Sequence, residues 1–171
     1  MIGEEDSNMR DGKSSLLKKC IAALPALFVM GMIFYFSSKT SQQSTEQSQA
    51  VSEGILHVSH LLAYFGVPEG AIPEVAEIIE VGIRKIGHFS EFAILGAVLY
   101  YAFSAWTLTW RCRAMLTGIV GVLYAASDEI HQMFVPGRGP AVYDVLIDAA
   151  GIGTALCLIF IFGYKRTSER R

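Results

Sequence analysis

An unbalanced set of ionisable residues is the feature of this chain that points to chemistry. They flank apolar stretches that carry no other charge. The potential anions are Glu91, Asp128, Glu129, Asp144 and Asp148, and the potential cations are Arg84, Lys85 and Arg138. Partly buried carboxylates in such excess must protonate, bind a metal ion or bind a cationic ligand. The imbalance therefore points to a functional site, with each of these three outcomes open.

Two histidines stand among these residues, either as partners for the carboxylates or as metal ligands. His88 and His131 with Asp128 or Asp144 would form a two-histidine, one-carboxylate zinc site, with Glu91 as general base. The chain contains no His-Glu-x-x-His spacing, and the histidines come from separate segments. We therefore expect no metal and no other cofactor. A zinc-dependent membrane hydrolase or transferase acting on a lipid-linked substrate is kept as the alternative.

The elements that must position these residues are membrane helices. Hydrophobic residues make up 52% of the chain and charged residues only 18%, against about 25% in soluble proteins. Two uncharged runs, Cys20–Ser38 and Phe92–Trp110, are each long enough to cover about 28 Å as a helix. This is close to the roughly 30 Å thickness of the bilayer core, so each run predicts a span.

Two further apolar runs, Ala114–Ser127 and Ala149–Tyr164, are too short to span alone. To cross the membrane, the third helix must continue through Gln132, and the fourth must begin near Asp144. The polar residues in these extensions therefore lie inside the membrane or at its edge.

The distribution of basic residues predicts the orientation of the four spans. With the N-terminus inside, the inner segments hold ten basic residues and the outer segments four: Arg10, Lys13, Lys18, Lys19, Arg111, Arg113, Lys165, Arg166, Arg170 and Arg171 against Lys39, Arg84, Lys85 and Arg138. Cytoplasmic loops carry the excess of Lys and Arg. Both termini are therefore predicted to lie inside.

The segment between the first and second spans is predicted to be external. Val51, Ile55, Val58, Leu62 and Phe65 recur at helical spacing, which favours an amphipathic helix on the outer leaflet. The expected fold is an all-α bundle of four transmembrane helices with this external helical segment. The membrane domain covers residues 20–164, between cytoplasmic tails at residues 1–19 and 165–171.

Helical geometry brings the polar residues to one depth at the outer membrane boundary. At 100° per residue, Asp128, His131 and Gln132 face one way and Glu129 points to the side. Asp144 and Asp148 share a face, and Gly151 continues it and permits close approach of another helix. The predicted polar or ligand-binding cluster consists of Lys85, His88, Glu91, Ser127, Asp128, Glu129, His131, Gln132, Arg138, Asp144 and Asp148.

Several of these segments resemble the VanZ-like family. The first is Lys85-Ile86-Gly87-His88-Phe89-Ser90-Glu91-Phe92. The second is Tyr124-Ala125-Ala126-Ser127-Asp128-Glu129-Ile130-His131-Gln132, followed by Pro136-Gly137-Arg138, Asp144-Val145-Leu146-Ile147-Asp148 and Gly151. Phe36-Ser37-Ser38 also looks like the family. Gly139-Pro140-Ala141 departs from the small-polar pair expected after the arginine. The resemblance implies a bacterial membrane protein, since the founding member is associated with resistance to teicoplanin, a lipoglycopeptide that acts outside the cell membrane.

The outer cluster favours a non-enzymatic binding function, and the resemblance implies a location in the bacterial cytoplasmic membrane. We expect the outer cluster to bind a lipoglycopeptide of the teicoplanin type, another amphiphile or a lipid headgroup. A net charge of −2 and a pI near 6.1 give no footprint for nucleic acid. A proton- or ion-coupled transporter is less favoured, because the inner halves of the spans carry no charges.

Overall fold

The computed structural model describes residues 2–39, 54, 57, 60–66, 68–136 and 142–168. All of its regular elements in these ranges are helices, which confirms the all-α prediction. They include α1 (Ile2–Ser37), the 3₁₀ turn η1 (Glu69–Ala71), α4 (Ile72–Ala102), the 3₁₀ turn η2 (Phe103–Ala105), α5 (Trp110–Gln132) and α6 (Val142–Ser168), and residues 60–64 are helical as well.

Three of these segments are long and apolar enough to cross a membrane. They are Ser14–Ser37 in α1, Val81–Ala105 in α4 and η2, and Val142–Gly163 in α6. The described residues thus contain three apolar helices of spanning length, which indicates a membrane protein. Helix α5 has 23 residues, about 35 Å of helix, but it is not among them. The apolar run of α5 ends just before Asp128 and Glu129, so only part of this helix is apolar.

The second helix ends earlier than the sequence predicts. The charge-free run ends at Trp110, whereas α4 ends at Ala102, and Trp106 is extended. Ser and Thr carry no charge but compete with the helix for backbone hydrogen bonds. Thr109 does so, since its side chain accepts the backbone N–H of Cys112 at 3.3 Å and caps the start of α5. At its other end α4 begins at Ile72, and its apolar span begins at Val81, so the predicted entry residues from Arg84 to Glu91 are helical.

The third and fourth helices have the predicted extensions. Helix α5 continues through Gln132 and α6 begins at Val142, so the polar residues near Asp128 and Asp144 are all helical. Val51, Ile55 and Val58 of the predicted external helix lie outside the described residues. The two predicted cytoplasmic tails are partly helical. Helix α1 begins at Ile2 and so includes most of the N-terminal tail, and α6 continues to Ser168 in the C-terminal tail.

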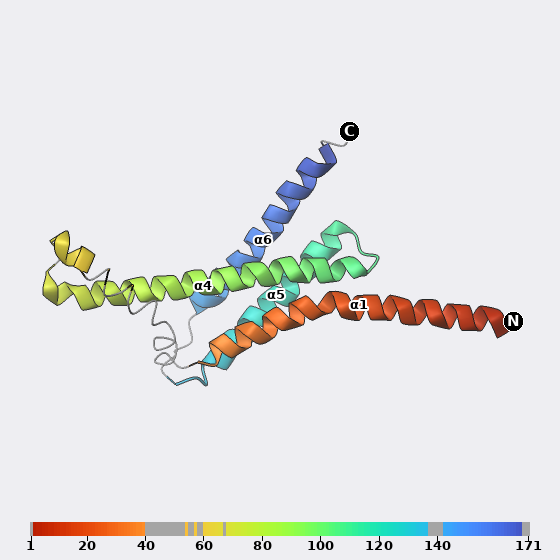
Figure 1. Ribbon diagram of the computed structural model, residues 1–171, viewed down its shortest axis with the longest axis horizontal. Coiled ribbons are helices and arrows are strands. Elements are labelled where there is room, and N and C mark those ends of the chain that lie inside the picture. The colour runs from red at the N-terminus through yellow and green to blue at the C-terminus, as the bar shows by residue number, and fades with distance from the viewer. Residues whose placement is uncertain are drawn as a thin grey trace.

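Helix α4 is the central element of the bundle, because it contacts α1, α5 and α6. In Figure 1, α1 and α4 run in opposite directions, and α6 crosses α4 and then diverges from it toward its C-terminal end. The buried core between the helices consists of Ala26, Ile33, Phe92, Leu95, Leu99, Ala125 and Ile152.

Two glycines set the crossing of α4 and α6. A Cβ atom at Gly151 would lie 2.3 Å from the carbonyl oxygen of Phe89, and one at Gly96 would lie 3.2 Å from the Cα of Ile152. The backbones therefore touch directly at this point, as predicted for Gly151. This crossing fixes Asp148, one turn earlier on α6, against α4.

Candidate functional site

A hydrogen-bonded group of three buried side chains joins α1 to α5. Asp128 Oδ2 accepts the hydroxyl of Ser37 at 2.8 Å and the amide of Gln132 at 2.9 Å. The Gln132 amide also lies 3.3 Å from the Ser37 hydroxyl oxygen. All three residues are buried. Because Asp128 and Gln132 are one helical turn apart, both reach the C-terminal end of α1.

His131 contacts the same end of α1. Its Nε2 lies 3.1 Å from the hydroxyl of Ser38, and its ring stacks on Phe34 at a centroid distance of 4.3 Å. Asp128, His131 and Gln132 therefore share one side of α5, as helical geometry predicts. Glu129 is also buried, because α5 contacts α1 and α4 as well as α6.

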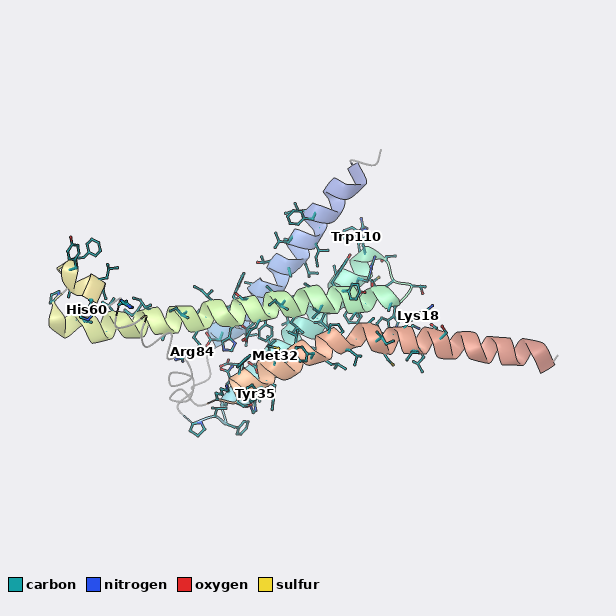
Figure 2. The ribbon with its side chains drawn as sticks, in the orientation of Figure 1. Lys18, Met32, Tyr35, His60, Arg84 and Trp110 are labelled. Atoms are coloured by element: carbon teal, nitrogen blue, oxygen red, sulfur yellow. The ribbon has the colours of Figure 1, made fainter. Side chains whose placement is uncertain are left out.

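A pocket of about 90 Å³ opens where α4, α5 and α6 meet. The lining residues come from the three segments that the sequence analysis grouped: Val81, Arg84, Lys85, His88, Gln132, Asp144, Ile147 and Asp148. Lys85 and Asp144 form an ion pair between half-exposed side chains. Figure 2 places Arg84 far from Trp110 and Lys18, so the pocket lies well away from that end of the bundle.

Asp148 is the most deeply buried charged residue of the pocket, with 3% of its surface exposed. The other four predicted carboxylates lie close enough to interact with it electrostatically. We call Glu91, Asp128, Glu129, Asp144 and Asp148 the carboxylate cluster. Within the described part of the chain, Oδ1 of Asp148 and Oδ1 of Asp128 have no hydrogen-bond partner. A buried carboxylate oxygen without a donor is costly, so the oxygen of Asp148, which lines the pocket, is suited to accept from a ligand.

Two residues of the predicted polar cluster, Ser127 and Arg138, are not among those that the structure brings together. Ser127 is exposed, and its hydroxyl donates to the carbonyl of Tyr124 on its own helix at 2.8 Å. Arg138 lies outside the described residues. Of the other predicted residues, Lys85, His88, Gln132, Asp144 and Asp148 line the pocket, and Asp128, His131 and Gln132 contact α1. Glu91 and Glu129 lie close enough to Asp148 to interact with it electrostatically.

Sequence reasoning missed the contribution of α1. Ser37 and Ser38 were noted for their resemblance to a family pattern but were not assigned to the cluster. Tyr124 adds a third contact, since its hydroxyl donates to the carbonyl of Met30 at 2.5 Å. The available signal was the abrupt change from Phe36 to two serines at the end of a long apolar run.

The described residues offer no ligand set for the alternative zinc site. Among them, no group of three or more His, Cys, Asp and Glu side chains is arranged to hold a metal ion. His88 lines the pocket, whereas His131 packs on Phe34 of α1. The arrangement thus gives no support to a zinc site shared by these two histidines.

The fold and the site define a helical membrane protein whose buried carboxylates lie together at one end of the bundle. The sequence matches the model of the family described as VanZ/LLP1 over residues 22–163, most of its length, and the chain belongs to that family. Comparisons with curated proteins and with solved structures gave no significant match.

Proposed function

We propose that the pocket binds the cationic headgroup of an amphiphile at the outer membrane face and that the protein acts as a resistance factor against lipoglycopeptides of the teicoplanin type. The observation that carries the proposal is Asp148. Its carboxylate is buried, lines the pocket and has an oxygen with no donor in the described residues. A ligand ammonium would supply that donor and offset the negative charge of the cluster.

The size of the pocket limits what it can take. A volume of about 90 Å³ corresponds to roughly three water molecules at about 30 Å³ each. This suits an amino group and its nearest carbons, with the apolar part of the ligand left in the bilayer. Lys85 and Arg84 at the same pocket suit a phosphate or carboxylate next to the amine, as in a lipid headgroup.

The proposal includes a four-span topology with the pocket outside. Helix α5 would be the remaining span. It is long enough, and its polar end contacts the other helices rather than lipid. Figure 1 shows both chain ends on the side of the bundle away from the start of α6. The excess of Lys and Arg at that side favours the cytoplasm.

The topology is tested by thiol labelling of intact cells. Cys20, Cys112 and Cys157 are replaced first, and single cysteines are introduced at Ser48 and Ser168. An impermeant thiol reagent is expected to label the cysteine at position 48 only. Labelling of position 168 from outside would place the pocket in the cytoplasm and contradict the proposal.

The binding function is tested with teicoplanin. Bacteria that express the chain are expected to need more teicoplanin for growth inhibition, and Asp148→Asn should abolish the increase. Purified protein should bind teicoplanin in calorimetry, and the substitution should weaken binding tenfold or more, because a charge-assisted hydrogen bond contributes about 1.5–3 kcal/mol.

Glu74→Gln is the matched control, because Glu74 is an exposed carboxylate on the same protein and outside the pocket. It should retain both resistance and binding. Equal teicoplanin binding by the wild type and by a folded, inserted Asp148→Asn variant would refute the proposed role of the pocket.

A further inference from the structure

A second, larger groove lies at the other end of the bundle, away from the carboxylate cluster. Its volume is about 630 Å³, within the roughly 300–1,000 Å³ of small-molecule sites. It forms where α6 has diverged from α4 (Figure 1), between the end of α4, the start of α5 and the last turns of α6. Tyr100, Trp110, Arg113, Leu156 and Phe160 are among its lining residues.

The lining of this groove is apolar and aromatic except for one cation. Arg113 places its guanidinium 5.2 Å from the ring centroid of Tyr100. Its Nε atom is buried and has no hydrogen-bond acceptor in the described part of the chain. A buried guanidinium donor gains most from an anionic oxygen, and phosphate oxygens match its planar fork.

More basic residues at this end of the bundle lie over aromatic rings. Arg111 lies over Trp110 at 5.4 Å, and Lys19 lies over Trp106 at 6.0 Å. Aromatic rings with basic side chains are typical of the level at which lipid headgroups begin. The apolar part of the groove, at Leu156 and Phe160, then continues into the depth of the acyl chains.

We propose that this groove binds one anionic phospholipid, with its phosphate on Arg113 and an acyl chain along Leu156 and Phe160. The site is separate from the pocket of the proposed function and does not depend on it. A free phosphate would satisfy Arg113 alone. The long apolar lining beside it favours an occupant that carries a hydrocarbon chain.

The two tryptophans permit a direct test. In a Trp106→Phe background, Trp110 is the single tryptophan and lies in the groove itself. The protein is reconstituted in phosphatidylcholine vesicles that contain brominated phosphatidylglycerol, or brominated phosphatidylcholine as the neutral probe. Bromine on the acyl chain quenches a nearby tryptophan, so quenching reports which lipid occupies the groove.

We expect phosphatidylglycerol to associate about fivefold more strongly than phosphatidylcholine, the factor for one basic residue near an anionic headgroup. Arg113→Gln should bring the two lipids to equal association, and Arg113→Lys should retain part of the preference. Lys18→Gln is the matched control, since it removes one charge from the same end of the bundle but outside the groove, and it should keep the preference.

Ala114→Leu tests the acyl-chain part of the site without changing charge. Ala114 lines the groove, so a leucine should fill it and lower quenching by both lipids. The proposal is overturned if the wild type shows no preference or if Arg113→Gln keeps it. It is also overturned if brominated lipid quenches Trp110 in the Ala114→Leu variant as strongly as in the wild type. If Arg113→Gln does not fold, the lipid preference of the wild type and the Ala114→Leu result decide.

Discussion

Both ends of the bundle hold ionisable side chains in an apolar environment, but the surroundings of these side chains differ. At one end Asp128, Glu129 and Asp148 are buried in protein, and Asp128 accepts hydrogen bonds from Ser37 and Gln132. At the other end Arg113 stays at the edge of a wide groove, over the ring of Tyr100. Short carboxylates need protein partners, whereas long basic side chains reach aromatic rings and lipid headgroups.

One crossing point produces both arrangements. The α4 and α6 backbones touch at Gly151, so the residues just before it, including Asp148, are pressed against α4. After the crossing, the helices separate, and the groove opens between Tyr100 and Phe160. Narrow pocket and wide groove are thus two consequences of the same helix angle.

The largest effect is expected from adding a methyl group at the crossing of α4 and α6. Gly151→Ala places a Cβ atom 2.3 Å from a backbone oxygen, and a backbone cannot move aside as a side chain can. We expect a loss of about 3 kcal/mol, the upper end of overpacking effects, measured by thermal unfolding in detergent.

Gly153→Ala is the control for this substitution, because a Cβ atom there would meet nothing within 4 Å. It should be neutral or stabilise the helix by up to about 1 kcal/mol. Equal unfolding temperatures for the two variants would show that the close crossing does not hold the bundle together.

The carboxylates of the pocket should differ in their contribution to ligand binding. Asp148 is buried and has an oxygen without a donor, whereas Asp144 is half-exposed and paired with Lys85. Asp148→Asn should weaken teicoplanin binding tenfold or more, and Asp144→Asn should weaken it less, since solvent screens an exposed pair. A larger effect of Asp144→Asn in calorimetry would move the binding site to the mouth of the pocket.

Two fully buried hydroxyls offer a matched comparison of paired and unpaired polar groups. Ser37 donates to Asp128, whereas the hydroxyl of Thr117 has no partner in the described residues. Ser37→Ala should cost about 1 kcal/mol of unfolding free energy, and Thr117→Val should cost nothing or stabilise. If both variants lose the same stability in a detergent unfolding series, the Ser37–Asp128 bond contributes nothing specific.

The smallest effect is expected for the zinc content of the His131→Ala variant. His88 and His131 serve different contacts, so purified protein should contain no stoichiometric zinc, and His131→Ala should not change the zinc content. One zinc per chain that disappears in His131→Ala would instead support the alternative of a metal-dependent hydrolase.

The sequence predicted the parts of the fold that depend on local patterns. The period of the helix brought Asp128, His131 and Gln132 to one side of α5, and the spacing of Asp144, Asp148 and Gly151 located the face of α6 that meets α4. These relations hold within a single helix, where geometry is fixed at 100° per residue.

Relations between distant segments were harder to predict. The Ser37–Asp128 bond joins residues 91 positions apart, and a serine gives no local signal of its partner. The end of α4 at Ala102 was missed because absence of charge does not distinguish helix from the Ser- and Thr-containing turn that follows. The predicted ligand class is not encoded in either pattern, so it stays a proposal.

The polar character of α5 has a consequence for how the protein is made. In the proposed four-span topology, Asp128 and Glu129 would each cost about 2.5–3.5 kcal/mol if they had to insert near the centre of a bilayer without partners. Helix α1, with Ser37, is synthesised long before them, and α6 directly after. Biogenesis therefore favours insertion of α5 and α6 as one hairpin, against a surface that α1 and α4 have already assembled.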